Sequence, residues 1–359
     1  MGAGRMKGEK LRVGVAGLGY WGPNLVRVLM ENPRADVRYC CDLDPAKLAK
    51  LSVRYPTIQL TREYQDLLKS DIDAVVLAVP VEAHYPLTCQ ALQAGKHVFV
   101  EKPLAASSEQ ALEMIRLATE STLLLMVGHT FEYSPPVTTI KKLVDQSILG
   151  KILYATSSRV NLGLFQRTID VIWDLVPHDF SILFFWLGES PTRVRTIGRA
   201  CMHPHLCDVA FLDLEFPSGV VGHVEVSWLA PTKLRRTTLV GTERMILYDD
   251  VEATEKVKIF DRGVSLKEPE TFGEWQLTYR LGDIVIPCLD NKEPLALEME
   301  DFISSILEQR SPRADGWNGY RVVAAIEAAQ RSLRNGGVYE PVLLHPDALA
   351  KPVSSSSGR

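Results

Sequence analysis

The stretch Leu11-Arg-Val-Gly-Val-Ala-Gly-Leu-Gly-Tyr-Trp-Gly22 joins a short apolar strand to a glycine-rich turn and the start of a helix. Gly17, Gly19 and Gly22 have the spacing G-x-G-x-x-G. In a dinucleotide site the first glycine permits the tight turn, the second lets a pyrophosphate approach the backbone, and the third lets the helix pack on the strand. N–H groups at the helix start then bind the phosphates. The alternative is an ordinary strand, turn and helix with a coincidental glycine spacing.

An acidic residue follows the second expected strand. Residues 37–41 form an apolar segment that ends at Asp42, about twenty residues after the last glycine. A carboxylate at this position accepts a hydrogen bond from a ribose 2′-hydroxyl and repels a 2′-phosphate. The order strand, glycines, helix, strand and acid therefore predicts NAD as the cofactor in preference to NADP.

The composition is that of an ordinary globular protein. Hydrophobic residues make up 46% and charged residues 23% of the 359 residues, which are enough for two domains with a sizeable core. The formal net charge of -4 gives no electrostatic footprint for nucleic acid or an anionic membrane. No apolar run is long enough to span a bilayer, so we expect neither nucleic acid nor membrane as a partner.

Cysteine usage and the two ends of the chain favour a cytoplasmic location. The six cysteines contain no C-x-x-C pair and no disulfide-framework spacing. Residues 1–10 lack the apolar segment of a signal peptide, and residues 354–359 are of low complexity. We expect a disordered extension at 1–10 and a disordered tail at 346–359.

The arrangement of expected elements changes along the chain. Up to residue 127, strands alternate with helices, which predicts a parallel, doubly wound sheet with ligands at the carboxyl ends of its strands. Beyond Gly150, several strands follow one another around a helix within 173–187, which predicts an antiparallel sheet with helices on one face. These strands are expected at 152–161, 194–201, 209–216, 220–228 and 236–240, and two late helices at 295–309 and 317–334. The expected fold class is α/β plus α+β.

Lys102 follows the strand expected at 97–100, on the side of the sheet where the cofactor should lie. A lysine there can hydrogen-bond a substrate hydroxyl, or the carbonyl it becomes, and stabilise negative charge on that oxygen during hydride transfer. The alternative is a lysine on a surface loop.

Asp174 and His178 lie four residues apart, so a helix would place both on one face. A histidine oriented by a carboxylate can remove a hydroxyl proton near neutral pH. The alternative is a capping Asp174 and an incidental His178, with Pro177 as the first helical residue.

Two further segments carry candidate ligands. His84, after Pro80, either contacts the nicotinamide ribose or caps the next helix. The segment Cys201-Met-His-Pro-His-Leu-Cys207 contains the residue types of a zinc site, but Pro204 interrupts a strand there and no second ligand cluster is apparent. We therefore expect no metal.

These residues resemble the Gfo/Idh/MocA family, which contains glucose-fructose oxidoreductase, inositol dehydrogenase and rhizopine-catabolism oxidoreductases. The resemblance covers nearly the whole chain, and the string that ends in Glu-Lys-Pro is more specific than the glycine motif. The matching segments are 17–22, 41–44, 94–103, 128–130, and Asp174 with His178. The resemblance implies a Rossmann domain at 11–128. It also implies a substrate-binding and oligomerisation domain at 129–345, built on a large open sheet, in a homodimer or homotetramer.

The resemblance also implies roles for individual residues. The catalytic residues are Lys102, His178 and Asp174. The cofactor-binding residues are Gly17, Gly19, Tyr20, Trp21, Gly22, Asp42, Pro80, His84, Glu101 and Lys102. The residues of the sugar pocket are His129, Arg159 and Asn161. Ser181 stands where many members have a second Asp, and Val176-Pro177 replaces a common glycine.

Segments 161–165 and 173–179 look most like those of members that act on nucleotide-linked or other activated sugars. The resulting hypothesis is an NAD-dependent oxidoreductase that oxidises a ring hydroxyl to a ketone, at C3 of a UDP-sugar such as a UDP-N-acetylglucosamine derivative. The enzyme alternatives are a ketosugar reductase and an inositol or free-sugar dehydrogenase. The alternative of another class is a non-catalytic NAD-binding regulator, which would need neither Lys102 nor His178.

Overall fold

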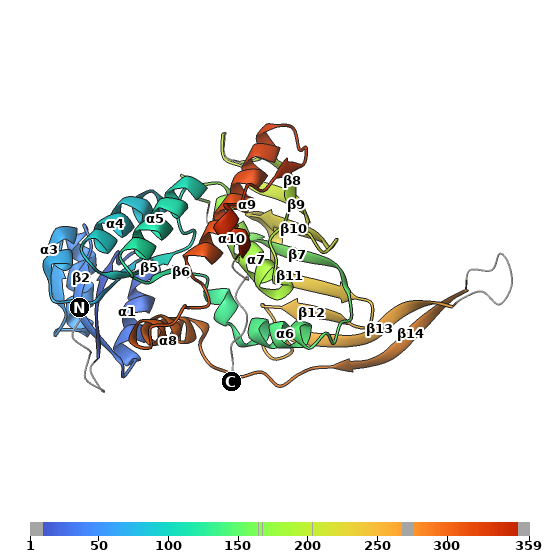
Figure 1. The fold of residues 1–359 in the computed structure, drawn as a ribbon, viewed down its shortest axis with the longest axis horizontal. Coiled ribbons are helices and arrows are strands. Elements are labelled where there is room, and N and C mark those ends of the chain that lie inside the picture. The colour runs from blue at the N-terminus through green and yellow to red at the C-terminus, as the bar shows by residue number, and fades with distance from the viewer. Residues whose placement is uncertain (1–9, 164, 167, 203, 268–275, 351–359) are drawn as a thin grey trace. The chain divides into compact units, whose positions relative to one another are not determined.

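The computed structural model describes residues 10–163, 165–166, 168–202, 204–267 and 276–350 (Figure 1). Its contacts divide the chain into two compact units, of which the first contains residues up to 133 and residues 292–323, and the second contains 134–291 and the residues from 324 onward. The sequence predicts one boundary between the domains, after residue 128. In the structure, residues 292–323 also belong to the first unit, because the helix within this segment packs on early elements.

In the first unit, the described residues form a sheet of six parallel strands in the order β3-β2-β1-β4-β5-β6. The strands are β1 (Leu11–Ala16), β2 (Ala35–Cys41), β3 (Gln59–Thr61), β4 (Ala74–Leu77), β5 (His97–Glu101) and β6 (Leu125–Gly128). All four residues of β4 are buried, as its continuous apolar run predicts. The strand order reverses between β1 and β4, the place where such sheets bind ligands. The predicted doubly wound sheet is confirmed.

Helices connect these strands. They are α1 (Gly22–Glu31), α2 (Pro45–Arg54), α3 (Tyr64–Lys69), α4 (Val81–Gln93), α5 (Ser108–Glu120), the 3-10 helix η1 (Thr130–Tyr133) and α8 (Pro294–Leu307), with α9 (Gly316–Arg334) beginning in this unit. Asp44 caps α2 by accepting a hydrogen bond from the Ala46 N–H (2.8 Å), and Ser107 caps α5 in the same way through the Gln110 N–H (3.2 Å). These caps explain why the two helices begin at Pro45 and Ser108.

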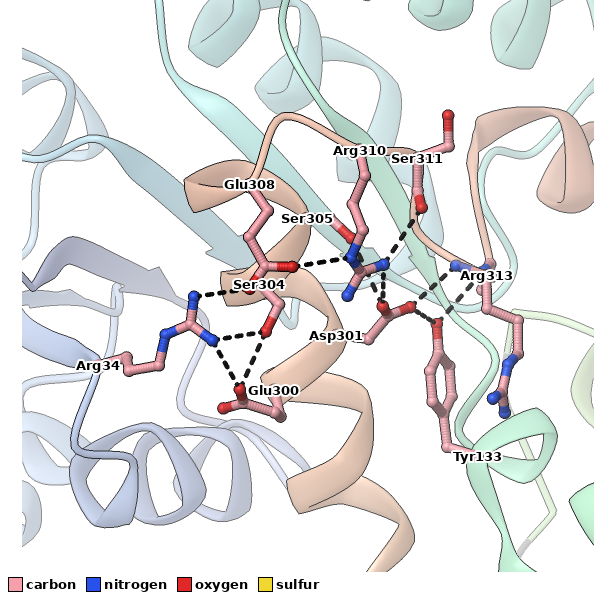
Figure 2. Close-up of polar contacts among 11 residues, drawn as sticks. Arg34, Tyr133, Glu300, Asp301, Ser304, Ser305, Glu308, Arg310, Ser311 and Arg313 are labelled. Carbon is pink, nitrogen blue, oxygen red and sulfur yellow. Dashed lines mark hydrogen bonds and ion pairs between the residues drawn. The ribbon is translucent and has the colours of Figure 1, made fainter. Parts of the chain in front are cut away.

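Helix α8 is fastened to the first unit by side-chain contacts, which Figure 2 shows. Arg34, between α1 and β2, forms an ion pair with Glu300 (3.1 Å). Asp301 accepts hydrogen bonds from the Tyr133 hydroxyl (2.7 Å) and the Arg313 backbone N–H (2.9 Å). Helix α8 therefore becomes part of the first unit through Arg34 and Tyr133, which lie more than a hundred positions before it in the sequence.

In the second unit, the described residues form a nine-stranded sheet in the order β14-β13-β12-β11-β7-β10-β9-β8-β15. Among the described strands of this sheet, only β7 and β10 pair in parallel, and the other pairs are antiparallel. The strands are β7 (Ile152–Leu162), β8 (Arg193–Arg199), β9 (Val209–Glu215), β10 (Val221–Ser227), β11 (Leu229–Gly241), β12 (Met245–Asp249), β13 (Val257–Lys267), β14 (Gln276–Val285) and β15 (Glu340–Pro341). The predicted large, mostly antiparallel sheet is confirmed.

One face of this sheet is covered and the other is open. Helix α7 (Val171–Leu187) packs on β7, β9 and β10. Along β10, Val224 and Val226 are buried, whereas Val221 is 47% exposed on the opposite face. Phe211 on the neighbouring strand β9 is 42% exposed. The alternation of side chains therefore leaves apolar surface on the face away from α7.

Two short helices complete the second unit. Helix α6 (Pro135–Asp145) follows η1 directly, and α10 (Pro346–Ala350) occupies the start of the segment expected to be a disordered tail. Residues 1–9 and 351–359, which hold most of the expected disorder, lie outside the described residues. In the described part of the chain, no helix is long and apolar enough to cross a membrane.

Candidate functional site

The glycine turn after β1 has the geometry that a dinucleotide needs. Gly17 has φ +95°, and a Cβ there would overlap the carbonyl oxygen of Ala78. A Cβ on Gly22 would overlap the carbonyl oxygen of Gly17. A Cβ on Gly19, in contrast, would meet nothing within 4 Å. The first and third glycines are thus required by the packing of the protein itself, and the second leaves the backbone open to an approaching pyrophosphate.

The start of α1 is suited to an anion. No side chain caps the helix, and its first turn contains no acidic residue. The preceding residues, Tyr20 and Trp21, are 90% and 37% exposed, and their rings stack with centroids 6.3 Å apart. These observations fit the cofactor contacts predicted for the segment 17–22.

Asp42 is held in place by the backbone at the end of β2. Its carboxylate accepts hydrogen bonds from the N–H groups of Leu18 (2.6 Å) and Asp44 (2.9 Å), and Lys47 Nζ lies 3.4 Å from both oxygens. Burial by itself would raise the pKa of Asp42, but the two N–H bonds and the Lys47 charge outweigh burial and lower it. The hydrogen bond from Leu18 N–H thus joins the glycine turn directly to Asp42, the acid that is predicted to bind the ribose.

His84 lies in the first turn of α4, which begins after Pro80. Its ring is 1% exposed, with Nδ1 2.8 Å from the Pro103 carbonyl oxygen and Nε2 2.9 Å from that of Val79. Burial lowers the pKa of this imidazole. In the structure His84 thus ties the end of β4 to the segment after β5, and its contact with the cofactor stays a prediction.

Glu101 and Lys102 follow the buried part of β5. Glu101 Oε2 accepts a hydrogen bond from the Lys102 backbone N–H (3.3 Å). Glu101 Oε1 is buried without a hydrogen-bond partner among the described residues. Burial raises the pKa of Glu101 to about 7, against the pull of the Lys102 charge. The Glu101 carboxyl thus lies beside the predicted catalytic lysine.

His129 and Glu298 form a buried polar region near Lys102. His129 is 1% exposed, and neither ring nitrogen has a hydrogen-bond partner among the described residues. Burial, assisted by the Lys102 charge, lowers the pKa of His129 to about 3. Glu298 of α8 accepts a hydrogen bond from the Thr130 hydroxyl (2.7 Å), and burial followed by the Glu101 charge raises its pKa well above the usual range. The sequence analysis did not identify Glu298. The only signal for Glu298 in the sequence is that it is an acidic residue within a largely apolar helix.

In the second unit, α7 carries Asp174 and His178 one turn apart, as predicted. Asp170 caps the helix by accepting a hydrogen bond from the Trp173 N–H (3.0 Å). The helix therefore begins at Val171, and Pro177 lies inside it. The alternative, in which Asp174 is the cap and Pro177 the first helical residue, is wrong.

Trp228, which the sequence analysis did not identify, connects Asp174 to the end of β7. Its indole Nε1–H donates to Asp174 Oδ2 (3.1 Å), and the ring is 1% exposed. Its carbonyl accepts a hydrogen bond from the Gly163 N–H (3.0 Å), and the Phe165 ring packs on it with centroids 5.5 Å apart. A tryptophan directly after a strand was visible in the sequence, but its partner 54 residues away was not.

Trp228→Phe should lower kcat about tenfold, the effect of losing one hydrogen bond to a carboxylate, while the Kd for NADH stays unchanged. Trp186→Phe is the matched control, because Trp186 is equally buried and donates to the Val137 carbonyl (2.9 Å) on α6. Steady-state kinetics and melting temperatures, measured for both variants, distinguish Trp228→Phe from Trp186→Phe. Equal losses of kcat in both variants would mean that Trp228 has only a structural role.

The predicted sugar-pocket residues of β7 differ in exposure. Arg159 is 5% exposed, and its Nε donates to Asp179 of α7 (2.7 Å). Asp179 also accepts a hydrogen bond from the Ser157 hydroxyl (2.8 Å), so this ion pair fastens α7 to the sheet. Asn161 is half-buried at the end of the strand, with its side-chain oxygen beside Gly163. Substrate contacts of Arg159 and Asn161 stay predictions.

The segment from Cys201 to Cys207 is organised by a carboxylate. Asp208 is fully buried and accepts hydrogen bonds from the backbone N–H groups of Cys201 (2.9 Å) and Met202 (2.7 Å). His203 lies outside the described residues. Within the residues that the structure describes, no group of three or more His, Cys, Asp or Glu could hold a metal ion.

Comparison with known proteins agrees with this geometry. Residues 11–129 match the family described as "Oxidoreductase family, NAD-binding Rossmann fold", and residues 137–247 match the "GFO/IDH/MocA C-terminal domain". The UDP-N-acetylglucosamine 3-dehydrogenase of Acidithiobacillus ferrooxidans is 29% identical over 263 residues, which are 72% of this chain and 78% of that protein. An inositol 2-dehydrogenase of Corynebacterium glutamicum is 26% identical over 95% of this chain and 99% of its own.

A solved structure extends the similarity to three dimensions. The structure of UDP-N-acetylglucosamine 3-dehydrogenase GnnA from Acidithiobacillus ferrooxidans superposes with a TM-score of 0.76 at 25% identity, over 91% of this chain and 98% of that one. The two family matches together span both the glycine turn and the helix with Asp174 and His178. The chain therefore belongs to the Gfo/Idh/MocA oxidoreductase family, and NAD is the cofactor of its Rossmann domain.

Proposed function

We propose that this oxidoreductase is an NAD-dependent dehydrogenase of a nucleotide-linked sugar, which oxidises the C3 hydroxyl of a UDP-N-acetylglucosamine derivative to a ketone. The similarity to the UDP-N-acetylglucosamine 3-dehydrogenase supports this substrate class. The inositol 2-dehydrogenase, which is similar over 95% of this chain, supports inositol oxidation as the second candidate.

In the proposed reaction, His178 removes the proton from the sugar hydroxyl while Asp174 orients its ring. Lys102 stabilises the negative charge that develops on the same oxygen. NAD supplies the hydride acceptor, nicotinamide C4, so the hydrogen on the sugar carbon leaves as hydride and the carbon becomes a ketone. The predicted contacts of His129, Arg159 and Asn161 with the sugar are part of this proposal.

The observation that carries the proposal is the position of Lys102. Lys102 directly follows β5, at the carboxyl end of the parallel sheet, and its backbone N–H bonds the buried Glu101 carboxylate. A protein that merely bound NAD as a regulator would not need a lysine at this point. We therefore favour a catalytic function.

The experiment is an absorbance assay of purified protein with a panel of UDP-sugars, sugar phosphates, free sugars and inositols, each with NAD. NADH formed with a UDP-N-acetylglucosamine derivative supports the proposal, and NADH formed only with an inositol supports the second candidate. Ketosugars with NADH test the reductase direction. If NADH binds and no substrate reacts in either direction, the proposal is contradicted in favour of a non-catalytic regulator.

We further propose that the open sheet face is covered by a second copy of the chain. Ile197 and Phe211 pair across β8 and β9, and together with Val221 on β10 they are each more than 40% exposed. Large apolar side chains exposed on a sheet face favour an interface. Light scattering of the purified protein should give the mass of two or four chains. A monomer at micromolar concentration would contradict this proposal.

A further inference from the structure

Glu298 of α8 faces Glu101 of β5 inside the first unit. Phe99 and Glu101 lie two residues apart on β5, and therefore on one face of the strand. Both lie over Gly128 of β6, because a Cβ on this glycine would be 3.0 Å from Glu101 Oε2 and 3.1 Å from the Phe99 ring. The Phe99 ring contacts that of Phe302 on α8, with centroids 5.8 Å apart. Glu298 precedes Phe302 by one helical turn, so its side chain points to the same face of β5.

Each of these two carboxyls has one buried oxygen without a hydrogen-bond partner among the described residues, Oε1 of Glu101 and Oε1 of Glu298. Glu298 is 0% exposed, and its Oε2 already accepts a hydrogen bond from the Thr130 hydroxyl (2.7 Å). A buried polar atom without a partner is costly. Ionised carboxylates only accept hydrogen bonds, so they cannot bond each other. A hydrogen bond between the two carboxyls, direct or through one water molecule, requires a proton on one of them.

The surroundings decide which carboxyl carries the proton. Glu101 accepts a hydrogen bond from the Lys102 backbone N–H (3.3 Å), and the Lys102 charge also favours its ionised form. Burial raises the pKa of Glu101 to about 7, whereas burial and then the Glu101 charge raise the pKa of Glu298 well above its usual range. Two like charges in one buried site are unfavourable, so the pair holds one proton above pH 7, and Glu298 carries it.

Other titratable groups face Glu298 from the elements packed around α8. Glu132 on η1 and Asp301 on α8 itself add negative charge when ionised, which favours the protonated form of Glu298. His129 adds no charge, because burial lowers its pKa to about 3. The remaining charged or titratable groups have partners of their own: Arg27 with Glu293, Arg34 with Glu300 and Glu308, Arg310 and Tyr133 with Asp301, and Arg313 with the Tyr133 ring.

We propose that Glu298 is a positioning residue, which keeps a proton and donates a hydrogen bond to Glu101, so that Glu101 stays ionised as the counter-ion of Lys102. The inference deepens the proposed function, because it rests on the catalytic role of Lys102 in the oxidation of the sugar hydroxyl. Glu298 acts through Glu101 and Lys102 and not by touching the sugar.

Infrared difference spectroscopy tests the protonation of Glu298 without any substrate. The spectrum of Glu298→Gln is subtracted from that of the original full chain at about pH 8, above the pKa of Glu101 at about 7. The difference should contain the C=O stretching band of a protonated carboxylic acid, which an ionised carboxylate lacks. Glu300→Gln is the matched control, because Glu300 lies on the same helix in an ion pair with Arg34 (3.1 Å; Figure 2). Its difference should contain only carboxylate bands, and the same result for Glu298 would overturn the proposal.

Kinetics with NAD and the sugar of the panel that reacts test the effect on Lys102. Glu298→Gln keeps a neutral N–H donor toward Glu101, so kcat should stay within about threefold. Glu298→Leu removes the donor, and kcat should fall about tenfold. The acid limb of its pH profile should move to higher pH, because Glu101 loses a bond to its ionised form and takes up a proton more readily.

Glu132→Leu is the control for lost stability. Glu132 is equally buried in the same unit, and its two oxygens accept hydrogen bonds from the Asn318 amide (3.1 and 3.2 Å), so its loss should destabilise the fold and leave the acid limb in place.

An acid limb that stays in place in Glu298→Leu would overturn the proposal, since a merely structural role does not move it. If Glu298→Leu does not fold, a loss of kcat above about tenfold in Glu298→Gln overturns it instead. Failure of the proposed function shows separately, as normal turnover of Lys102→Ala, and the infrared result still reports the protonation of Glu298.

Discussion

Lys102→Ala should lower kcat by about 10²- to 10⁴-fold, the range typical of a lost acid–base or charge-stabilising group. The Kd for NADH should stay within about twofold. The glycine turn and Asp42 supply other predicted cofactor contacts, and these do not involve the Lys102 side chain. The loss therefore reports on the chemical step. Steady-state kinetics with the reactive sugar and fluorescence titration with NADH measure the two quantities.

The control for this variant is Lys96→Ala. Lys96 belongs to the same unit and donates from Nζ to the Ile72 carbonyl (2.8 Å), so its loss removes a lysine with a structural contact only. We expect its kcat to be nearly unchanged. Near-normal turnover of Lys102→Ala, or an equal loss in Lys96→Ala, would refute the catalytic assignment.

His178→Ala should also lower kcat by about 10²- to 10⁴-fold, because the sugar hydroxyl loses its general base. Added imidazole should restore part of the rate, since a small base can enter the space left by the ring. A merely structural loss would not respond to imidazole. Kinetics of the variant with and without imidazole, under saturating NAD, measure the effect.

His223→Ala is the matched control for His178→Ala. His223 lies on the open face of the sheet, where its Nδ1 is 2.8 Å from Asp213 Oδ1, and it has no place in the proposed reaction. It should keep its turnover and show no response to imidazole. If His178→Ala retains normal turnover, a different residue must remove the proton.

Local sequence signals predicted most of the first unit. Helix α5 is one of the helices that alternate with strands as expected, because Ser107 provides a cap and apolar residues recur with helical spacing. The glycine motif also predicted the backbone conformation of its turn, since the structure has no room for a side chain at Gly17 or Gly22. Such features depend on residues close in the sequence, and the sequence therefore reveals them.

Contacts between residues far apart in the sequence could not be predicted from local sequence signals. Glu298 meets Thr130 across 168 positions, and Trp228 meets Asp174 across 54. Lys47 alters the charge beside Asp42 only because the start of α2 turns its side chain back toward β2. Strand β14 was not expected either. These features depend on tertiary packing, which a pattern of single residues does not encode.

Product analysis of one reaction tests the central claim most directly. Purified protein is incubated with NAD and UDP-N-acetylglucosamine or its uronic acid derivative, and both NADH and the sugar product are followed. The account predicts stoichiometric NADH and a UDP-sugar that has lost the mass of one hydrogen molecule, with the ketone at C3. Formation of NADH with an inositol and with no UDP-sugar would contradict the proposed substrate.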